Sequence, residues 1–301
     1  GRVRGRTVPA AAAFRAALYG LWASLPSIMV GCQAHSRSTY LAGMDLQLKG
    51  KTYAVGGATS GLGRAITDRL LAEGATVVGI ARGQDKLDAL VQEVGMGFIP
   101  YAADLTEFSD VVDLAKDLNA RQIAGIVLNA GGPPTGRTDE LDLKAWDAAY
   151  ADTLRWKVQL TQALLPELKK REHGRLLYLE SVSIKQPIDN LVLSNAFRAA
   201  VAGYVKTLSR EIGPSGVTAN ILAPGYHATP RITTVLEKSA QQLGRPLAEI
   251  EAEFAAETSL KRIGSPADFA GMAAFLLSPA GGYVTGQTIT VAGGLVRHIT
   301  G

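Results

Sequence analysis

YAVGGATSGLG, residues 53–63, is the most informative segment of the chain, because a short apolar run passes directly into glycines spaced G-x-x-x-G-x-G. Glycines permit a tight turn and let the backbone approach a pyrophosphate, which then lies at a helix N-terminus whose free N–H groups and dipole favour anions. Glycines also serve ordinary strand-to-helix turns, and the usual dinucleotide spacing is G-x-G-x-x-G. This turn follows the first strand of an alternating pattern, with a helix beginning near Leu62, and that position favours dinucleotide binding.

Outward from this turn, strand-like and helix-like segments alternate from Lys51 onward. Short runs rich in Val, Ile and Leu predict strands at residues 53–56, 76–80, 98–101, 125–128, 175–179, 218–222 and 288–291. Helical stretches lie at 62–73, 86–94, 109–118, 145–168 and 193–212. Continuous apolar strands indicate burial on both faces, and the helices supply the right-handed crossovers of a parallel sheet. The sequence therefore predicts an α/β fold: a single Rossmann-type, doubly wound domain over 45–301, with a seven-stranded parallel sheet flanked by helices.

The charge balance does not favour a polyanionic partner. The chain of 301 residues has a net charge of +4, but residues 1–44 contain five arginines and no acid, so the rest holds 26 basic against 27 acidic residues. The body is therefore nearly neutral, and neither nucleic acid nor a membrane is expected as a partner. The single cysteine, Cys32, excludes a disulfide scaffold and a Cys-rich zinc site, and no metal site is expected.

Residues 1–44 are interpreted as a leader or non-native extension outside the fold. A transit peptide fits the Arg-rich, acid-free composition. A secretory signal fits less well, because Pro26 interrupts the charge-free run from Ala16 to Cys32, which is also shorter than the roughly 20 residues of a spanning helix. The third alternative is translated upstream sequence, with Met44 as the true start. A cytoplasmic location is expected, with organellar targeting left open.

Further motifs follow the glycine turn in a fixed order. They are Asp104 after the third strand, Asn129-Ala130-Gly131 closing the fourth, Pro224-Gly225 and Thr229 after the sixth, and Gly286-Gln287 with Gly293-Gly294 near the end. With these motifs, residues 45–297 resemble the short-chain dehydrogenase/reductase family, although Ala292 stands where Asp is common. The resemblance implies that Asp104 contacts adenine and that Thr229 contacts the nicotinamide carboxamide. The cofactor-binding residues assigned on this basis are Gly57, Ser60, Gly61, Leu62, Gly63, Arg82, Asp104, Leu105, Asn129, Ala130, Gly131, Arg198, Pro224, Gly225 and Thr229.

The end of the second strand indicates which nicotinamide cofactor is used. Proteins that use NAD place a carboxylate there for the ribose 2′-hydroxyl, whereas those that use NADP place a cation there for the 2′-phosphate. In this chain Ala81 holds the position of the acid and Arg82 follows it. A guanidinium is suited to bidentate binding of phosphate, so NADP(H) is expected in preference to NAD(H).

The catalytic positions depart from the family, whose tetrad is Asn, Ser, Tyr and Lys. The segment WDAAYADTL, residues 146–154, places Thr153 at the Asn position, and Ser181 matches the catalytic Ser. Thirteen residues further on, Ser194 replaces Tyr, and Arg198 replaces Lys four residues later. The S-x-x-x-R spacing keeps both side chains on one helical face. A serine hydroxyl is a far weaker acid than a phenol, however, and an arginine does not relay protons.

Other groups were considered for the missing proton donor. Glu180 and Lys185 flank Ser181, and His227 lies in the loop that resembles the family's substrate lid, where a solvated histidine is the simpler interpretation. Ser183 is a register alternative to Ser181 that shortens the spacing to Ser194, and Tyr204 lies too far along the helix. The lid is expected at about 229–260, where Arg231 and Lys238 either meet an anionic substrate or are simply solvated.

The function expected is that of a divergent NADP(H)-dependent oxidoreductase that transfers a hydride to or from a small carbonyl-like substrate. The residues placed at its catalytic site are Thr153, Ser181, Ser194 and Arg198. The alternative is a nucleotide-binding scaffold without redox activity: a sensor, a partner subunit or a non-redox enzyme. The helices at 145–168 and 193–212 correspond to those that pair subunits in the family, so a homotetramer or homodimer is expected.

Overall fold

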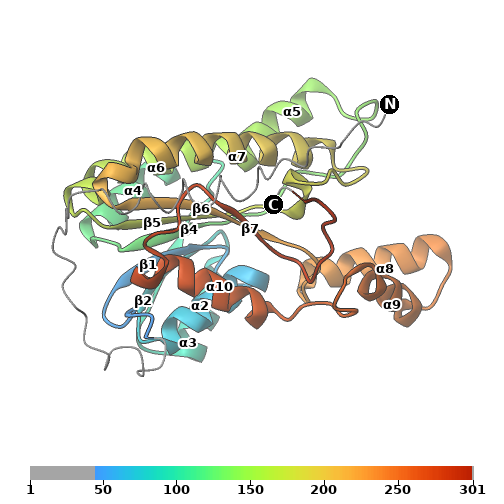
Figure 1. Cartoon of the computed structure of the whole chain (residues 1–301), viewed down its shortest axis with the longest axis horizontal. Helices are drawn as coiled ribbons and strands as arrows, with labels where there is room; N and C mark the ends of the chain where they lie inside the picture. Colours follow the sequence, from blue (N-terminus) through green and yellow to red (C-terminus); the bar gives the residue numbers. More distant parts are fainter. Residues whose placement is uncertain (1–44, 300–301) are drawn as a thin grey trace, which may run out of the picture. The chain divides into compact units, whose positions relative to one another are not determined.

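The computed structural model describes residues 45–299, and the predictions for the leader lie outside them. From Leu46 onward the chain forms one unit, in which seven strands make a parallel sheet of order β3-β2-β1-β4-β5-β6-β7 (Figure 1). The strands are β1 (Thr52–Gly56), β2 (Thr76–Ala81), β3 (Phe98–Ala102), β4 (Gly125–Leu128), β5 (Gly174–Leu179), β6 (Val217–Pro224) and β7 (Thr288–Val291). The predicted Rossmann-type sheet is confirmed, and several strands extend a residue or two beyond their predicted bounds.

Helices cover both faces of this sheet (Figure 1). One layer consists of α2 (Gly61–Ala72), α3 (Gln84–Val94) and α10 (Pro266–Leu277), and the other of α4 (Phe108–Ala120), α6 (Trp156–Lys170) and α7 (Val192–Ile212). Successive side chains of a strand point to opposite faces. Tyr53 and Val55 of β1 accordingly pack with the layer of α2 and α10, whereas Ala54 between them packs with the layer of α6 and α7. Both faces are therefore buried, as the continuous apolar runs indicate.

The helix predicted over 145–168 is wrong as a single α-helix. Helix α5 (Leu143–Tyr150) passes into a π-helical turn, η2 (Ala151–Arg155), before α6 begins. A π-helical turn adds one residue to a helical turn and is frequent at functional sites. Apolar spacing does not reveal a single such insertion. On α5, before this turn, the ring centroids of Trp146 and Tyr150 lie 5.8 and 6.2 Å from that of Phe197 on α7.

The topology places a ligand site at the carboxyl ends of β1 and β4. The direction of strand order reverses between these neighbours, so the loops that follow them diverge. Helices α8 (Pro230–Leu243) and α9 (Leu247–Glu257) lie beyond the end of β6, within the segment predicted as a lid (Figure 1). None of the helices within residues 45–299 is long and apolar enough to cross a membrane.

Candidate active site

The glycine turn between β1 and α2 is built by close backbone contacts. A Cβ at Gly63 would overlap the carbonyl oxygen of Gly57, and one at Gly56 would overlap the carbonyl oxygen of Asn129. The Asn129 side chain donates a 3.0 Å hydrogen bond from Nδ2 to the Gly56 oxygen, which ties the turn to the end of β4. Ser60 precedes α2, and its hydroxyl makes no capping bond. The turn therefore leaves helix N–H groups and a hydroxyl available to an anion.

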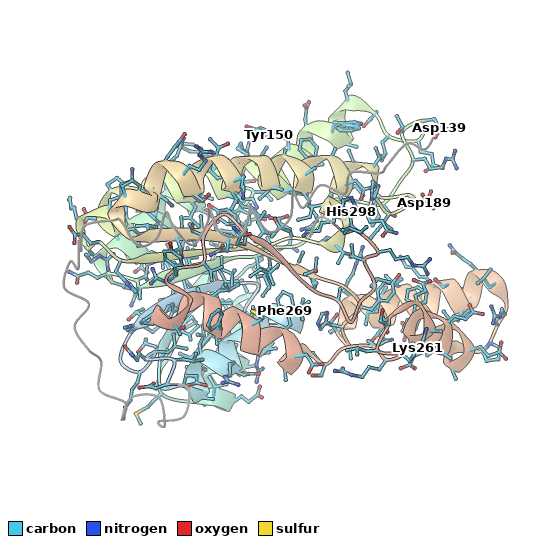
Figure 2. The ribbon with its side chains drawn as sticks, viewed as in Figure 1. Asp139, Tyr150, Asp189, Lys261, Phe269 and His298 are labelled. Carbon is cyan, nitrogen blue, oxygen red and sulfur yellow. The ribbon has the colours of Figure 1, made fainter. Side chains whose placement is uncertain are left out.

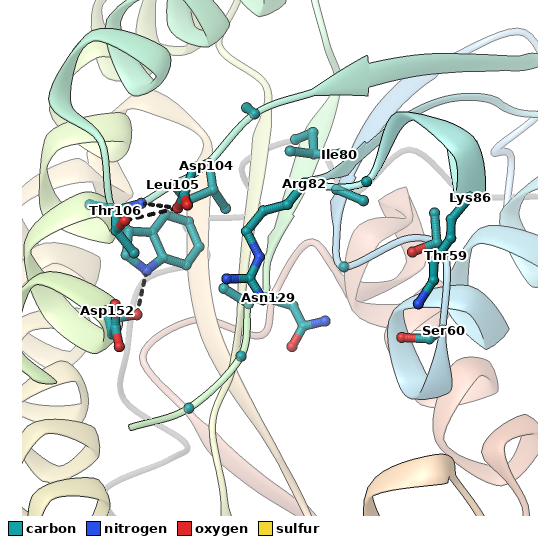
Figure 3. A pocket seen from close by; sticks show the side chains of 18 residues that line it. Thr59, Ser60, Ile80, Arg82, Lys86, Asp104, Leu105, Thr106, Asn129 and Asp152 are labelled. Carbon is teal, nitrogen blue, oxygen red and sulfur yellow. Dashed lines mark hydrogen bonds between the residues drawn. The ribbon is translucent and has the colours of Figure 1, made fainter. Parts of the chain in front are cut away.

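A cavity of about 460 Å³ extends from this turn over the carboxyl ends of β1, β2 and β4 (Figure 3). The predicted residues that line it are Gly57, Ser60, Arg82, Asp104, Leu105, Asn129, Ala130 and Gly131. Of the others, Gly61, Leu62 and Gly63 form the first turn of α2. Thr229 precedes α8, and its side chain lies 3.7 Å from the Cβ position of Gly61, so it faces the glycine turn. Pro224 ends β6, and Gly225 donates its N–H to the carbonyl of Val291.

Asp104 is held in place by local hydrogen bonds. Its carboxylate accepts from the backbone N–H of Thr106 at 3.0 Å and from the Thr106 hydroxyl at 2.8 Å. The bond from the Thr106 backbone is the main reason that the pKa of Asp104 lies below its usual value, and the nearby Arg82 adds to the effect. The carboxylate is therefore a fixed anion on the wall of the cavity.

Two charged lining residues, Lys86 and Asp152, are not predicted from the sequence. Lys86, in the first turn of α3, extends toward Thr59 and Ser60, while the Arg82 guanidinium extends across the cavity toward Asn129 (Figure 3). The sequence does contain a signal for Lys86, which is a second cation four residues after Arg82, in the first turn of the helix that follows β2. Asp152 lies at the opposite side of the cavity, and burial raises the pKa of its carboxyl.

The predicted helical pair does come together. Nε of Arg198 donates to Oγ of Ser194 at 2.9 Å, and Nη1 of Arg198 donates to Oε2 of Glu180 at 3.0 Å. The other oxygen of Glu180 accepts from Nζ of Lys157 at 2.5 Å. We call Lys157, Glu180 and Arg198 the buried ion triad, because their side chains are 4%, 0% and 14% exposed. Burial lowers the pKa of Lys157, while Glu180 opposes that shift.

Sequence reasoning missed this triad in part. The sequence indicates Glu180 only as a neighbour of Ser181, and it predicts no role for Lys157. A signal was present, since Lys157 stands on the same helical face as the buried Leu160 and Leu164. Glu180 likewise directly follows β5, all of whose residues are buried. A charge at either position needs a buried partner.

The remaining catalytic positions present hydroxyl groups. Oγ of Ser181 accepts from the backbone N–H of Ser183 at 3.1 Å, so the register alternative acts as its local partner. The hydroxyls of Thr153 and Ser183 are buried, and neither has a hydrogen-bond partner within the described residues. Thr153 lies at the centre of the π-helical turn. At this position, which the sequence predicts to be that of the family's Asn, the structure places a buried hydroxyl.

His227 is not placed as a proton donor for this site. It is only 4% exposed, and its ring meets that of Phe269 on α10 (labelled in Figure 2) edge-on, with centroids 5.3 Å apart. It lines a second cavity of about 190 Å³, and Phe269 belongs to the helix layer opposite α7. Burial lowers its pKa. The solvated-histidine interpretation is wrong as well, because the side chain is enclosed.

The residues present fit a nicotinamide dinucleotide. The glycine turn makes a cradle that Cβ atoms would fill, and the start of α2 leaves N–H groups available to an anion. The cavity is lined by two carboxyl groups, two cations and apolar side chains. Within residues 45–299 no group of three or more His, Cys, Asp or Glu side chains could hold a metal ion.

Comparison with known proteins agrees with this geometry. A family model described as Enoyl-(Acyl carrier protein) reductase matches residues 57–296. Dehydrogenase/reductase SDR family member 4 of Bos taurus is 31% identical over 258 residues, covering 84% of this chain and 89% of the relative. Cyclohexanol dehydrogenase of Rhodococcus sp. (strain TK6) is 30% identical over 275 residues, covering 83% and 98%. The structure of L-sorbose reductase from Gluconobacter frateurii, complexed with NADPH and L-sorbose, has a TM-score of 0.80 at 25% identity and covers 85% of this chain and all of that one (100%).

Proposed function

Because the chain belongs to the short-chain dehydrogenase/reductase family, we propose that it is an NADP(H)-dependent oxidoreductase that acts on a small carbonyl-like substrate through an altered catalytic site. The relatives are dehydrogenases and reductases, which supports an oxidoreductase. The observation that carries the proposal is the cavity at the glycine turn, because it keeps every feature of a dinucleotide site while the catalytic positions beside it differ.

The preference for NADP(H) rests on charge. Ala81, Arg82 and Lys86 line the end of the cavity beyond β2, so two cations lie where a ribose 2′-substituent is expected. Arg82 offers a planar fork of donors and Lys86 a mobile point charge. Both cations would strengthen the binding of a 2′-phosphate, whereas they would add little to the binding of a 2′-hydroxyl.

When bound, a reduced nicotinamide cofactor would supply the hydride for a carbonyl carbon, and with a proton on the carbonyl oxygen the products would be an alcohol and the oxidised cofactor. Ser181 and Ser194 are assigned to that oxygen. The Ser194 oxygen already accepts from Arg198, so its own hydroxyl hydrogen remains free to be donated. The adjacent guanidinium stabilises negative charge that develops on the oxygen. Since neither serine is a useful acid, water is the proton source that we assign.

Further parts of the proposal concern the rest of the protein. Residues 229–260, which contain α8 and α9, act as the substrate lid, and the chain from 45 to 301 is the dinucleotide-binding domain. We assign a homotetramer or homodimer and a cytoplasmic location. Size-exclusion chromatography with light scattering tests the first of these assignments, and imaging of a tagged full chain tests the second.

Titration of the full chain with NADPH and with NADH, followed by nicotinamide fluorescence, tests the proposed cofactor. We expect tight binding of NADPH and weak binding of NADH, with a loss of this difference in Arg82→Gln. Lys206→Gln is the matched control, because Lys206 lies on α7 outside the cavity, where it donates to the carbonyl of Gly286. Binding of neither nucleotide, or equal binding of both, would contradict the proposal.

A second candidate is a nucleotide-binding scaffold without redox activity, which Ser194 and Arg198 favour because they replace the family's proton donor and its lysine. The double substitution Ser194→Tyr with Arg198→Lys separates the two functions. If the native chain binds NADPH but reduces no ketone in a panel, and the double variant reduces one, the scaffold function is supported. Reduction by the native chain supports the enzyme.

A further inference from the structure

The buried ion triad contains one more positive than negative charge. Lys157 and Arg198 share the single carboxylate of Glu180, each with one of its two oxygens. The side chains of Lys157 and Glu180 are almost fully enclosed. An uncompensated charge is costly in such surroundings, so an arrangement of this kind is best stabilised by an anion.

Arg198 is the member of the triad that can reach such an anion. Two of its three nitrogens are engaged, Nε with Ser194 and Nη1 with Glu180. Within residues 45–299 no hydrogen-bond acceptor lies on Nη2. Nη2 lies 3.0 Å from the Cβ position of Gly132, in the loop after β4 that lines the cofactor cavity. The guanidinium is thus held through two of its nitrogens, and the third lies beside the loop that lines the cofactor cavity.

Among residues 45–299, no carboxylate other than that of Glu180 is paired with Arg198. Ser194 is neutral, and the two oxygens of Glu180 are both occupied. Asp152 lies on the cavity wall, where Asp104, Arg82 and Arg155 are the charges that act on it. The charges that act on Lys157 are Glu180 and Arg198, both within the triad. A neutral group, such as a ribose hydroxyl, can accept a hydrogen bond from Nη2 but leaves the charge uncompensated.

We propose that Arg198 is an anchor for a carboxylate on the substrate, so that the substrate is a small oxo acid. This rests on the proposed function for the oxo group, but the anchor itself depends only on the triad. Arginine remains charged and binds planar carboxylates, and its fixed orientation means that little freedom is lost on binding. Ser181 and Ser194 then lie beside the anchor to meet the carbonyl oxygen.

Acetoacetate and acetoacetamide are matched probes, because they have the same shape and differ in charge. Binding of each to the full chain is measured by calorimetry, with saturating NADP⁺ and again without nucleotide. The oxidised cofactor prevents turnover of a ketone. We expect acetoacetate to bind at least tenfold more tightly than acetoacetamide under both conditions, with a ratio that falls as salt is added.

Three variants locate this preference. Arg198→Gln is expected to bring the ratio close to one. Lys157→Met removes the surplus charge but keeps the Arg198–Glu180 pair, and it is expected to lower the ratio severalfold. Arg210→Gln, the same substitution at an exposed arginine further along α7, is the control that keeps the wild-type ratio. Thermal melts show which variants are folded, and Lys157→Met is the second test if Arg198→Gln does not fold.

Equal binding of the two probes by the wild type would overturn the anchor, as would an unchanged ratio in Lys157→Met. Loss of the preference in Arg210→Gln would show that the preference does not depend on Arg198 in particular, and it would overturn the anchor too. Failure of NADP⁺ to bind, with the acetoacetate preference intact, would defeat the proposed function and leave the anchor standing. The two failures are therefore distinguishable.

Discussion

Replacing Glu180 by glutamine should destabilise the protein more than any other isosteric change in the buried ion triad. Glutamine has the same shape, so no cavity forms, but the carboxylate that both Lys157 and Arg198 use is lost. Its amide oxygen can still accept from one cation, and its NH₂ group then faces the other. Removing one partner of a buried pair typically costs about 3–5 kcal/mol, because a buried charge is left unpaired.

This cost predicts a large shift in thermal stability. For a domain of this size, 1 kcal/mol corresponds to roughly 2–4 °C, so the melting temperature of Glu180→Gln should fall by roughly 6–20 °C. In Glu180→Gln, Lys157 can avoid being an unpaired buried charge by losing its proton, since burial already lowers its pKa. The unfolded chain then binds more protons than the folded one, so the deficit should shrink as the pH rises from 7 towards 10.

Circular dichroism melts and urea unfolding at pH 7 and pH 9 provide the measurement. Lys157→Met is the matched control, because it leaves Glu180 and Arg198 paired and is expected to be neutral or mildly stabilising. Adding Lys157→Met to Glu180→Gln should recover part of the loss. A melting temperature within 2 °C of wild type in Glu180→Gln, or an equal loss in Lys157→Met, would refute the reasoning.

Three further predictions concern other parts of the structure. Arg82→Gln should weaken NADPH binding about tenfold to a hundredfold, as expected for a charged hydrogen bond worth about 1.5–3 kcal/mol, and should leave NADH binding nearly unchanged in a fluorescence titration. Gly63→Ala should abolish nucleotide binding, because its Cβ would overlap a backbone carbonyl, whereas Gly61→Ala has space and should cost about 1–2 kcal/mol for its φ of +56° in urea unfolding. Burial and the neighbouring Arg175 lower the pKa of His173 to about 4, so the unfolded state binds more protons below pH 6.5 and stability should fall between pH 6.5 and 4. His173→Gln should reduce the difference between urea midpoints at pH 7 and pH 5, and an unchanged difference would contradict the assignment.

The fold could be predicted from the sequence because its signals are local. Each strand is a short apolar run, and each crossover helix has a recognisable face, so the order of elements follows from the chain itself. The glycine turn was predictable for the same reason, because the local backbone requires glycine at Gly57, Gly61 and Gly63. The π-helical turn was missed because one inserted residue leaves the apolar pattern almost unchanged.

Contacts in the candidate site were predictable only where both residues lie on the same helix or strand. The contact between Ser194 and Arg198 follows from their spacing on one helix. The residues of the buried ion triad come from α6, the end of β5 and α7. No local sequence pattern predicts which charged side chains on three separate elements will be in contact. His227 was misplaced for the same reason, because its enclosure depends on Phe269, more than forty residues away along the chain.

The orientation of α5 depends on the number of residues in the turn at Ala151–Arg155 more than on their identity. Each residue of an α-helix rotates the chain by about 100°, so deleting one residue here would swing α5 around its axis by that angle. Trp146 and Tyr150 would leave Phe197, the residue next to the carboxylate anchor proposed above. Insertions and deletions should therefore be excluded from this turn, whereas substitutions at its positions other than Asp152 and Thr153 should be tolerated better.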